Sequence, residues 1–326
     1  MPLVSDSPYR PPFYLFNGHL QTIVPSLMRA VPEVQYQRQR VETPDGDFLD
    51  LDWARTEYVT DSLAIISHGL EGDAGRPYVR GMARALNRAG IDSLAWNYRS
   101  CSGEPNRLLR AYHLGDTDDL HFVVQQAVAT GRYRRVFLTG FSAGGNVTLK
   151  YLGEDASRVP TAVERAAVFS VPTDLKAGSE QISRIQNRVY LNRFLKSLRL
   201  KIRQKAELLP GQLDLEGLDE LSNFPQFDNR FTAPMHGFKS ADEYYEHSSS
   251  GRYLDGIRIP TLLVNAQNDP FLAPTCFPHE AAKRSPYVFL ETPEEGGHVG
   301  FAEGTPDGVY YSERRAVEFL TAAVPA

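Results

Sequence analysis

The chain has 326 residues, of which 42% are hydrophobic and 23% charged, and its formal net charge is −5. This composition predicts one sizeable globular core with an insertion rather than two equal domains, and the negative charge argues against a nucleic-acid-binding protein. No stretch approaches the ~20 apolar residues that span a bilayer, and two distant cysteines favour a reducing cytoplasm over a disulfide framework.

The chain opens with an N-terminal arm and a β-hairpin. The arm, residues 1–35, is rich in proline, and residues 1–10 lack the apolar core of a signal peptide. We expect its aromatic residues Phe13, Tyr14 and Phe16 to pack against the body. The turn residues of Thr43-Pro44-Asp45-Gly46-Asp47 then predict a hairpin.

Strands alternate with helices from there on, which predicts a mostly parallel sheet with helices on both faces. We expect a strand that ends at His68, a helix over residues 78–89, a strand over 91–98, a helix that opens at Thr117, a strand over 135–139 followed by its helix, and a strand over 166–171. In such a sheet, functional groups gather at the carboxyl ends of the strands.

The most informative motif is Gly140-Phe141-Ser142-Ala143-Gly144, which follows the apolar run 135–139. A serine in a sharp strand-to-helix turn is held in a strained conformation that needs small neighbours, and its hydroxyl is exposed above the sheet as a nucleophile. The other interpretation is a glycine-rich turn with a solvated serine, because the motif is short.

Two later loops offer partners for this serine. Asp269 follows the apolar run 259–265, and His298 lies between glycines after a further strand expected over 287–291. The chain order of serine, aspartate and histidine is the order that α/β-hydrolases use for nucleophile, acid and base. As alternatives, Asp269 before Pro270 could open a turn, and His298 could be an ordinary loop histidine.

A third loop, His68-Gly69-Leu70-Glu71-Gly72, follows the buried run 63–67 and should lie beside the serine. Backbone amides of Leu70 and Ala143 could then stabilise an oxyanion. His68 could be a second base, but we favour a structural histidine that shapes the loop through its ring hydrogen bonds.

Other polar groups predict no further chemistry. Cys101 has no base in a matching position, and Asp116, Asp118 and Asp119 are better explained as caps of the next helix than as metal ligands. The eight histidines show no zinc-binding spacing, and neither a dinucleotide fingerprint nor a phosphate-binding loop is present. We therefore expect no metal and no cofactor.

Residues 173–257 interrupt the alternation and are long enough for a lid. Within this stretch, segment 184–205 carries eight basic residues and no acidic one, interleaved with apolar residues. One interpretation is peripheral contact with anionic lipid. We favour the other, a cap helix whose apolar stripe covers a pocket and whose charges are solvated or balanced by the acidic run 214–220.

These motifs together resemble the YheT-like branch of the α/β-hydrolase superfamily. The resemblance also includes Asn17-Gly18-His19-Leu20-Gln21-Thr22-Ile23, residues 45–53, 97–107 and 232–238, and Asp269-Pro270-Phe271. Two departures are Ser100, where the family usually has glycine, and Ala143, where leucine is common. The resemblance implies a soluble or peripherally bound serine hydrolase that acts on acyl esters. Together with the interrupted alternation, it leads us to expect an α/β-hydrolase core at residues 1–172 and 258–326 with a helical lid insertion at 173–257.

From these observations we expect a carboxylic ester hydrolase in which Ser142, Asp269 and His298 are catalytic, acting on short to medium-chain or lipid-like esters. Two alternatives stay open: an acyltransferase that passes the acyl group to an alcohol, and a non-catalytic, membrane-associated binding module. We expect no obligate protein partner, and a cytoplasmic location with contact to the inner membrane face as a further expectation.

Overall fold

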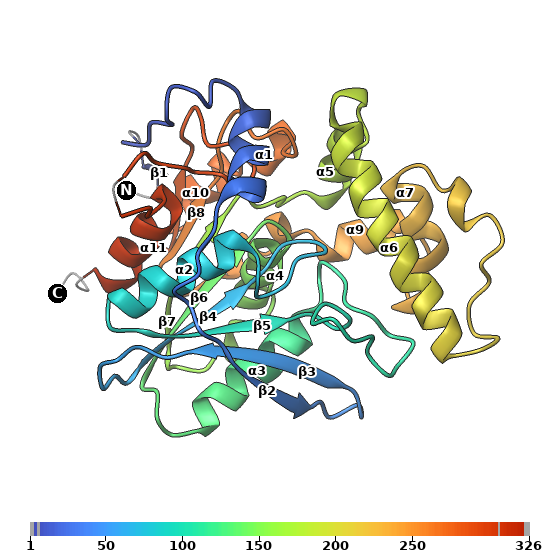
Figure 1. Ribbon diagram of the computed structural model, residues 1–326, viewed down its shortest axis with the longest axis horizontal. Helices are drawn as coiled ribbons and strands as arrows, with labels where there is room; N and C mark the ends of the chain where they lie inside the picture. Colours follow the sequence, from blue (N-terminus) through green and yellow to red (C-terminus); the bar gives the residue numbers. More distant parts are fainter. Residues whose placement is uncertain (1–2, 5–6, 306, 323–326) are drawn as a thin grey trace.

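A nine-stranded sheet runs through the part of the chain that the computed structural model describes, residues 3–4, 7–305 and 307–322. Its order is β1-β9-β8-β7-β6-β4-β5-β3-β2 (Figure 1). The strands are β1 Leu3–Val4, β2 Gln37–Glu42, β3 Phe48–Ala54, β4 Ser62–Ser67, β5 Asp92–Asn97, β6 Arg135–Phe141, β7 Val163–Phe169, β8 Thr261–Val264 and β9 Val288–Glu291.

The sheet is parallel from β1 through β5, and β3 and β2 pair antiparallel at one edge. The hairpin predicted at residues 43–47 joins β2 and β3 and is confirmed. Strands β4, β5 and β8 are buried throughout, as apolar runs in a sheet covered on both faces should be. The mostly parallel α/β fold that the sequence predicts is therefore confirmed.

Helices cover both faces of the sheet, and each face has its own apolar core. On one side α2 (Pro77–Arg88) and α11 (Tyr311–Thr321) pack over a cluster that includes Met82, Phe169 and Phe319. On the other side lie α3 (Thr117–Ala129), α4 (Ala143–Glu154) and α10 (His279–Arg284). The short 3₁₀ helices η1 (Ala156–Arg158) and η7 (Pro274–Cys276) lie in connecting loops.

The N-terminal arm leads into α1 (Gly18–Met28), whose N-terminus is capped by the Asn17 side chain. The prediction that the arm's aromatic residues pack against the body is wrong. Phe13 is 93% exposed and Phe16 is 74% exposed, whereas Tyr9 and Leu15 are buried. Residues 1–2 and 5–6 of the predicted arm lie outside the described residues.

Between β7 and β8 the regular structure is helical, and we call residues 173–257 the helical insertion. Its elements are α5 (Leu175–Ile182), η2 (Ile185–Asn187), α6 (Arg188–Leu208), η3 (Leu218–Glu220), α7 (Phe224–Phe227), η4 (Asp228–Thr232), α8 (Ala233–Met235), α9 (Ala241–Ser248), η5 (Ser250–Arg252) and η6 (Leu254–Gly256). Apolar residues of α6, including Leu191, Leu195 and Ile202, pack against Phe224 and Phe227 in a separate cluster.

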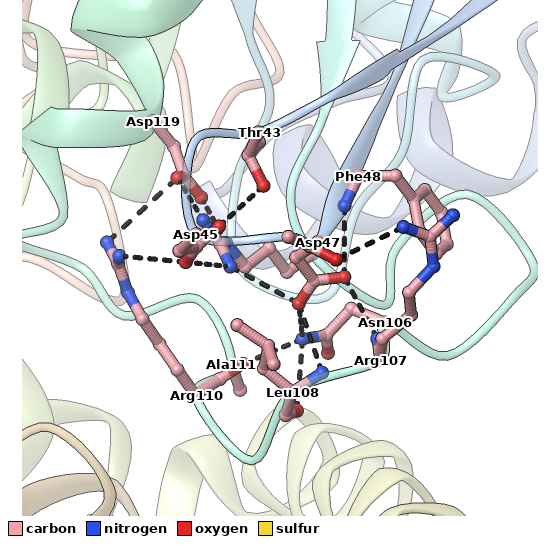
Figure 2. Close-up of polar contacts among 12 residues, drawn as sticks. Thr43, Asp45, Asp47, Phe48, Asn106, Arg107, Leu108, Arg110, Ala111 and Asp119 are labelled. Atoms are coloured by element: carbon pink, nitrogen blue, oxygen red, sulfur yellow. Dashed lines mark hydrogen bonds and ion pairs between the residues drawn. The ribbon is translucent and has the colours of Figure 1, made fainter.

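A buried carboxylate, Asp47, organises the loop that follows β5. It accepts hydrogen bonds from the amides of Phe48, Arg107 and Leu108 and from the Asn106 side chain, which lies 2.6 Å away (Figure 2). The Arg99 guanidinium also contacts it at 3.2 Å. Burial alone would raise the pKa of Asp47, but these donors outweigh burial and lower it.

The same loop is tied to the helical insertion. Lys205 of α6 donates to the carbonyl oxygens of Asn106 and Leu108 at 2.7 and 2.6 Å, and burial lowers its pKa to about 8.

Ser100 has a φ of 62°, which lies in the left-handed region that favours glycine. This conformation agrees with the glycine that the family resemblance leads us to expect at this position. The Ser100 hydroxyl donates to the Asn106 side chain at 2.6 Å, and this bond offsets part of the backbone strain.

We predict that Asp47→Asn destabilises the protein by about 3–5 kcal/mol, because Arg99 and three amides lose a buried anionic partner. Urea unfolding measured by circular dichroism would test this. The matched control is Glu42→Gln, which removes an exposed carboxylate paired with Arg107 and should cause no measurable change. Equal effects of the two variants would contradict the role given to Asp47.

Candidate active site

Ser142 occupies a sharp turn between β6 and α4. Its backbone has φ 53° and ψ −120°, which is strained for a residue other than glycine. The turn is possible because the residues two positions before and after Ser142, Gly140 and Gly144, have no side chains. A Cβ on Gly140 would lie 2.5 Å from the Gly144 oxygen, and a Cβ on Gly144 would lie 2.3 Å from the Ser67 oxygen. The glycines therefore let β6, α4 and the end of β4 approach one another.

The structure brings the three residues singled out in the sequence together. His298 Nε2 lies 2.9 Å from Ser142 Oγ, and His298 Nδ1 lies 2.9 and 3.1 Å from the two Asp269 oxygens. A carboxylate can only accept, so Nδ1 carries the proton and Nε2 presents a lone pair to the serine hydroxyl. The Asp269 side chain is buried, and that of His298 is 9% exposed.

The loop that carries His298 is held by α1 and by aromatic packing. The His298 amide donates to the Thr22 hydroxyl at 2.8 Å, and the Gly296 amide donates to the Gln21 side chain at the same distance. The ring of Phe271 packs on the imidazole with centroids 4.1 Å apart. These positioning residues lie in motifs quoted for the family resemblance, but the sequence offered no reason to connect α1 with His298.

The loop after β4 lies against the elbow, as the sequence predicted. A Cβ on Gly69 would come 3.3 Å from the Ser142 Cβ. Within the described part of the chain, neither the Leu70 amide nor the Ala143 amide donates a hydrogen bond to another protein group. Ala143 is the first residue of α4, where helix amides have no intrahelical partner.

His68 is a structural histidine, which confirms the interpretation that we favoured. Its Nδ1 lies 2.8 Å from the Gly69 oxygen, and its Nε2 accepts from the Tyr98 amide at 3.2 Å. Complete burial lowers its pKa to about 3, so the ring is neutral at physiological pH. Both ring nitrogens are engaged in shaping the loop, and neither is directed to the serine.

The acidic cluster before α3 differs in part from the prediction. Asp116 makes no side-chain cap and instead pairs with Arg110 at 2.8 Å; Asp119 pairs with Arg99 at 2.7 Å, and Asp118 with Arg158. Asp116 is the N-cap residue of α3, and Asp118 and Asp119 lie in its first turn, so their predicted position at the positive end of the helix dipole is confirmed, whereas the predicted side-chain cap of Asp116 is absent. Within the described ranges, no group of three or more potential metal ligands occurs.

Cys101 is also unlike a nucleophile. Its thiol is buried, which raises its pKa to about 11, and it accepts a hydrogen bond from Lys201 at 3.0 Å. A thiol with so high a pKa carries almost no thiolate at neutral pH, and the thiolate is the reactive form.

Two cavities meet at Ser142. The apolar cavity, about 130 Å³, extends beneath the helical insertion and is lined by residues that include Phe194, Leu198 and Phe227. The second cavity, about 300 Å³, lies between α1 and α6 and is lined by Ile23, Leu27, Val189 and Arg193 among others. Both cavities share Leu70, Phe194, Phe271 and His298 with Ser142.

The basic segment 184–205 divides into an N-terminal half, residues 184–196, and a C-terminal half, residues 197–205. In its C-terminal half Lys201 pairs with Glu71, Arg203 with Asp219, and Lys205 with backbone carbonyls. Arg184, Arg188, Arg193 and Lys196 of the N-terminal half are exposed and form no ion pair with a described residue. The apolar stripe of α6 does line a cavity, as the favoured interpretation expects.

The buried His68 predicts a specific pH dependence. In the unfolded chain its pKa is near 6.5, whereas in the folded chain it is about 3. Below pH 6.5 the unfolded state therefore binds a proton that the folded state does not, so the free energy of unfolding falls as the pH drops toward 3. His68→Gln should remove about one proton from the difference in protons bound by the unfolded and folded states, so the free energy of unfolding should depend less steeply on pH. His279→Gln, at an exposed histidine, should leave this dependence unchanged. Identical slopes in urea titrations would contradict the linkage.

Comparison with known proteins agrees with this geometry. Residues 65–305 match the model of the family described as alpha/beta hydrolase fold. The chain is 34% identical over 293 residues to the Escherichia coli (strain K12) protein named "Putative esterase YheT", which covers 89% of this chain and 85% of that protein. It is 30% identical to the mouse protein named "Phospholipase ABHD3", over 99% of this chain and 80% of that one.

A solved structure shares the fold at much lower identity. The Pyrococcus furiosus esterase Pf2001 superimposes with a TM-score of 0.57 and 17% identity, covering 90% of this chain and 97% of that one. In the part of the chain that is described, no helix combines the length and apolar character needed to cross a membrane. The strand order, the elbow and the sequence matches together place the chain in the α/β-hydrolase fold family, as a YheT-like member.

Proposed function

We propose that the protein is a serine hydrolase that cleaves carboxylic esters through an acyl-enzyme. The observation that carries this proposal is the continuous chain of contacts from Asp269 through His298 to Ser142, with 2.9 Å at each step. The serine lies on a strained elbow at the carboxyl edge of the sheet, where its hydroxyl faces both cavities. This arrangement suits a nucleophile with an adjacent base and an orienting acid.

The first half of the reaction forms the acyl-enzyme. Ser142 Oγ attacks the ester carbonyl carbon while His298 Nε2 takes the hydroxyl proton, and Asp269 stabilises the resulting imidazolium. The amides of Leu70 and Ala143 stabilise the oxyanion of the tetrahedral intermediate, and each such donor is worth roughly 3–4 kcal/mol in the transition state. The intermediate collapses when the C–O bond to the alcohol breaks and His298 returns the proton to the leaving oxygen.

The second half hydrolyses the acyl-enzyme. Water attacks the acyl carbon, His298 removes its proton, and collapse of the second intermediate returns the proton to Ser142 Oγ. The product is a carboxylic acid. No step requires a cofactor.

The two cavities suggest how the substrate is divided. We place the acyl chain in the apolar cavity, because burial of methylene groups there gives about 0.8 kcal/mol each. The alcohol part then lies in the second cavity, between α1 and α6. The helical insertion acts as the lid of this site. The names of two relatives, phospholipase and, in Saccharomyces cerevisiae at 28% identity, monoacylglycerol lipase, support lipid-like esters as substrates.

We predict that Ser142→Ala lowers kcat for p-nitrophenyl butyrate by a factor on the order of 10⁶, because no other group supplies the nucleophile. Steady-state kinetics on purified protein would measure this, and a fluorophosphonate probe should label the parent protein but not the variant. Ser222→Ala, at an exposed serine of the helical insertion, is the control and should keep full activity. Retained turnover or labelling in Ser142→Ala would refute the assignment.

We also propose peripheral contact with anionic lipid, restricted to the N-terminal half of segment 184–205 and the adjacent face of α1. The four basic residues of this half form no ion pair with a described residue. The same half carries Ile185 and Val189, which are 78% and 77% exposed. Leu27 and Met28 of α1 are 69% and 79% exposed, and Leu27 lines the second cavity together with Val189 and Arg193. The surface surrounds the second cavity, so a lipid substrate could enter directly from it.

Vesicle binding tests the contact. Replacement of Arg184 and Arg188 by alanine should weaken binding to phosphatidylcholine vesicles containing phosphatidylglycerol roughly thirtyfold, since each basic residue at an anionic surface contributes about 1 kcal/mol. Arg252→Ala with Arg258→Ala makes the same charge change elsewhere and should have little effect. The contact would be disproved by failure of the parent protein to float with these vesicles at low salt, or by equal loss in both double variants.

A further inference from the structure

Glu71 directly follows Leu70, one of the proposed oxyanion donors, and has an unusual conformation for its residue type. Its φ is 53°, a left-handed value that a residue with a Cβ adopts only when surrounding contacts hold it. Its amide donates to the Tyr112 hydroxyl at 3.1 Å, and that hydroxyl donates to Glu71 Oε1 at 2.6 Å. The carboxylate side chain is only 4% exposed.

The backbone oxygen of Glu71 accepts from Arg76 at 2.8 Å, and the remaining partners of its carboxylate come from the helical insertion. Lys201 of α6 lies 2.9 Å from Glu71 Oε1, and the hydroxyl of Ser197, one turn earlier on the same helix, donates to Oε2. Lys201 also contacts the Cys101 thiol at 3.0 Å, so it bridges α6 to the loop after β5. Burial by itself would lower the pKa of Lys201, but the thiol and the carboxylate outweigh burial and raise it.

These contacts join α6 to the loop that would stabilise the oxyanion. A buried carboxylate needs a partner, because an uncompensated charge in this environment is strongly unfavourable. If α6 moved away, the Glu71 carboxylate would lose Lys201 and Ser197 together, and its strained backbone would keep only the contacts with Tyr112 and Arg76. The neighbouring amide of Leu70 would then lose part of the support that fixes its position.

We propose that Glu71 and Lys201 are positioning residues that couple docking of α6 to the alignment of the Leu70 amide. This inference rests on the proposed function. It implies that α6 remains on the core during the chemical steps and that the substrate enters between α1 and α6, through the second cavity. The helical insertion therefore completes the catalytic site as well as covering it.

Lys201→Met should lower kcat for p-nitrophenyl butyrate at least tenfold and leave KM within about twofold, because an oxyanion donor acts in the transition state rather than in substrate binding. Lys201→Arg keeps the charge and should restore most of the activity. Arg203→Met, which breaks an exposed ion pair on the same helix, is the matched control and should have the activity of the parent protein.

Amide hydrogen exchange gives a readout that does not depend on turnover. Peptides covering residues 68–73 should exchange faster in Lys201→Met than in the parent protein or in Arg203→Met, while peptides from β6 and α4 stay unchanged. Unchanged kcat in a folded Lys201→Met variant, or unchanged exchange in residues 68–73, would overturn the coupling. Loss of protection across the whole chain would also overturn it, since Lys201 would then have a general structural role. Failure of the proposed function itself is distinguishable, because Ser142→Ala would then retain the activity of the parent protein.

Discussion

The strained turn at Ser142 is the constraint on which the rest of the site depends. A serine at φ 53° is tolerated only because Gly140 and Gly144 allow β6, α4 and the end of β4 to approach within contact distance. That approach brings the loop after β4 beside the hydroxyl, and the parallel order of β8 and β9 brings the loops of Asp269 and His298 to the same edge. The strain is offset by packing on both faces of the sheet, where the two apolar cores lie.

Buried polar groups and apolar contacts both connect the helical insertion to this framework. Leu254 and Ile257 at its end belong to the main core, whereas Lys201 and Lys205 reach from α6 to the loops around the site. Removal of one partner of a buried pair is costly, and the geometry of such a pair is more specific than that of an aliphatic contact. The arrangement therefore favours one position of α6 on the core, and it explains why the loop after β5 needs the Asp47 carboxylate beneath it.

The elements and the three candidate residues could be predicted from the sequence, because each depends on local signals. Apolar runs mark the strands, glycines mark the elbow, and the chain order of serine, aspartate and histidine is a property of the sequence itself. The domain limits and the catalytic roles stay predictions. The partners of the acidic residues before α3 could not be predicted, since Arg99 lies on a different element and local capping was the only contact visible.

Two other features depend on tertiary contacts in the same way. The α1 motif positions the His298 loop from 276 residues away, through Thr22. The basic segment looked uniform in sequence, but its halves differ because Glu71 and Asp219 reach only the C-terminal one. The exposed aromatic residues of the arm were misjudged for a related reason: apolar character predicts burial only where the body offers a surface, and Tyr9 and Leu15 occupy it.

The division of α6 has a consequence for how a lipid ester would approach the proposed nucleophile. In its C-terminal half, Lys201 pairs with Glu71 and Lys205 donates to carbonyl oxygens of the loop after β5, and this half forms a wall of the apolar cavity. The basic side chains of its N-terminal half are exposed, and that half borders the second cavity. A hinged lid that lifts the whole helix would have to break the buried contacts of Lys201 and Lys205 at once. A substrate that arrives between α1 and α6 leaves those contacts in place, and its acyl chain can pass Ser142 into the apolar cavity without that cost. Entry from the α1 side is therefore the path that the charges of this helix favour.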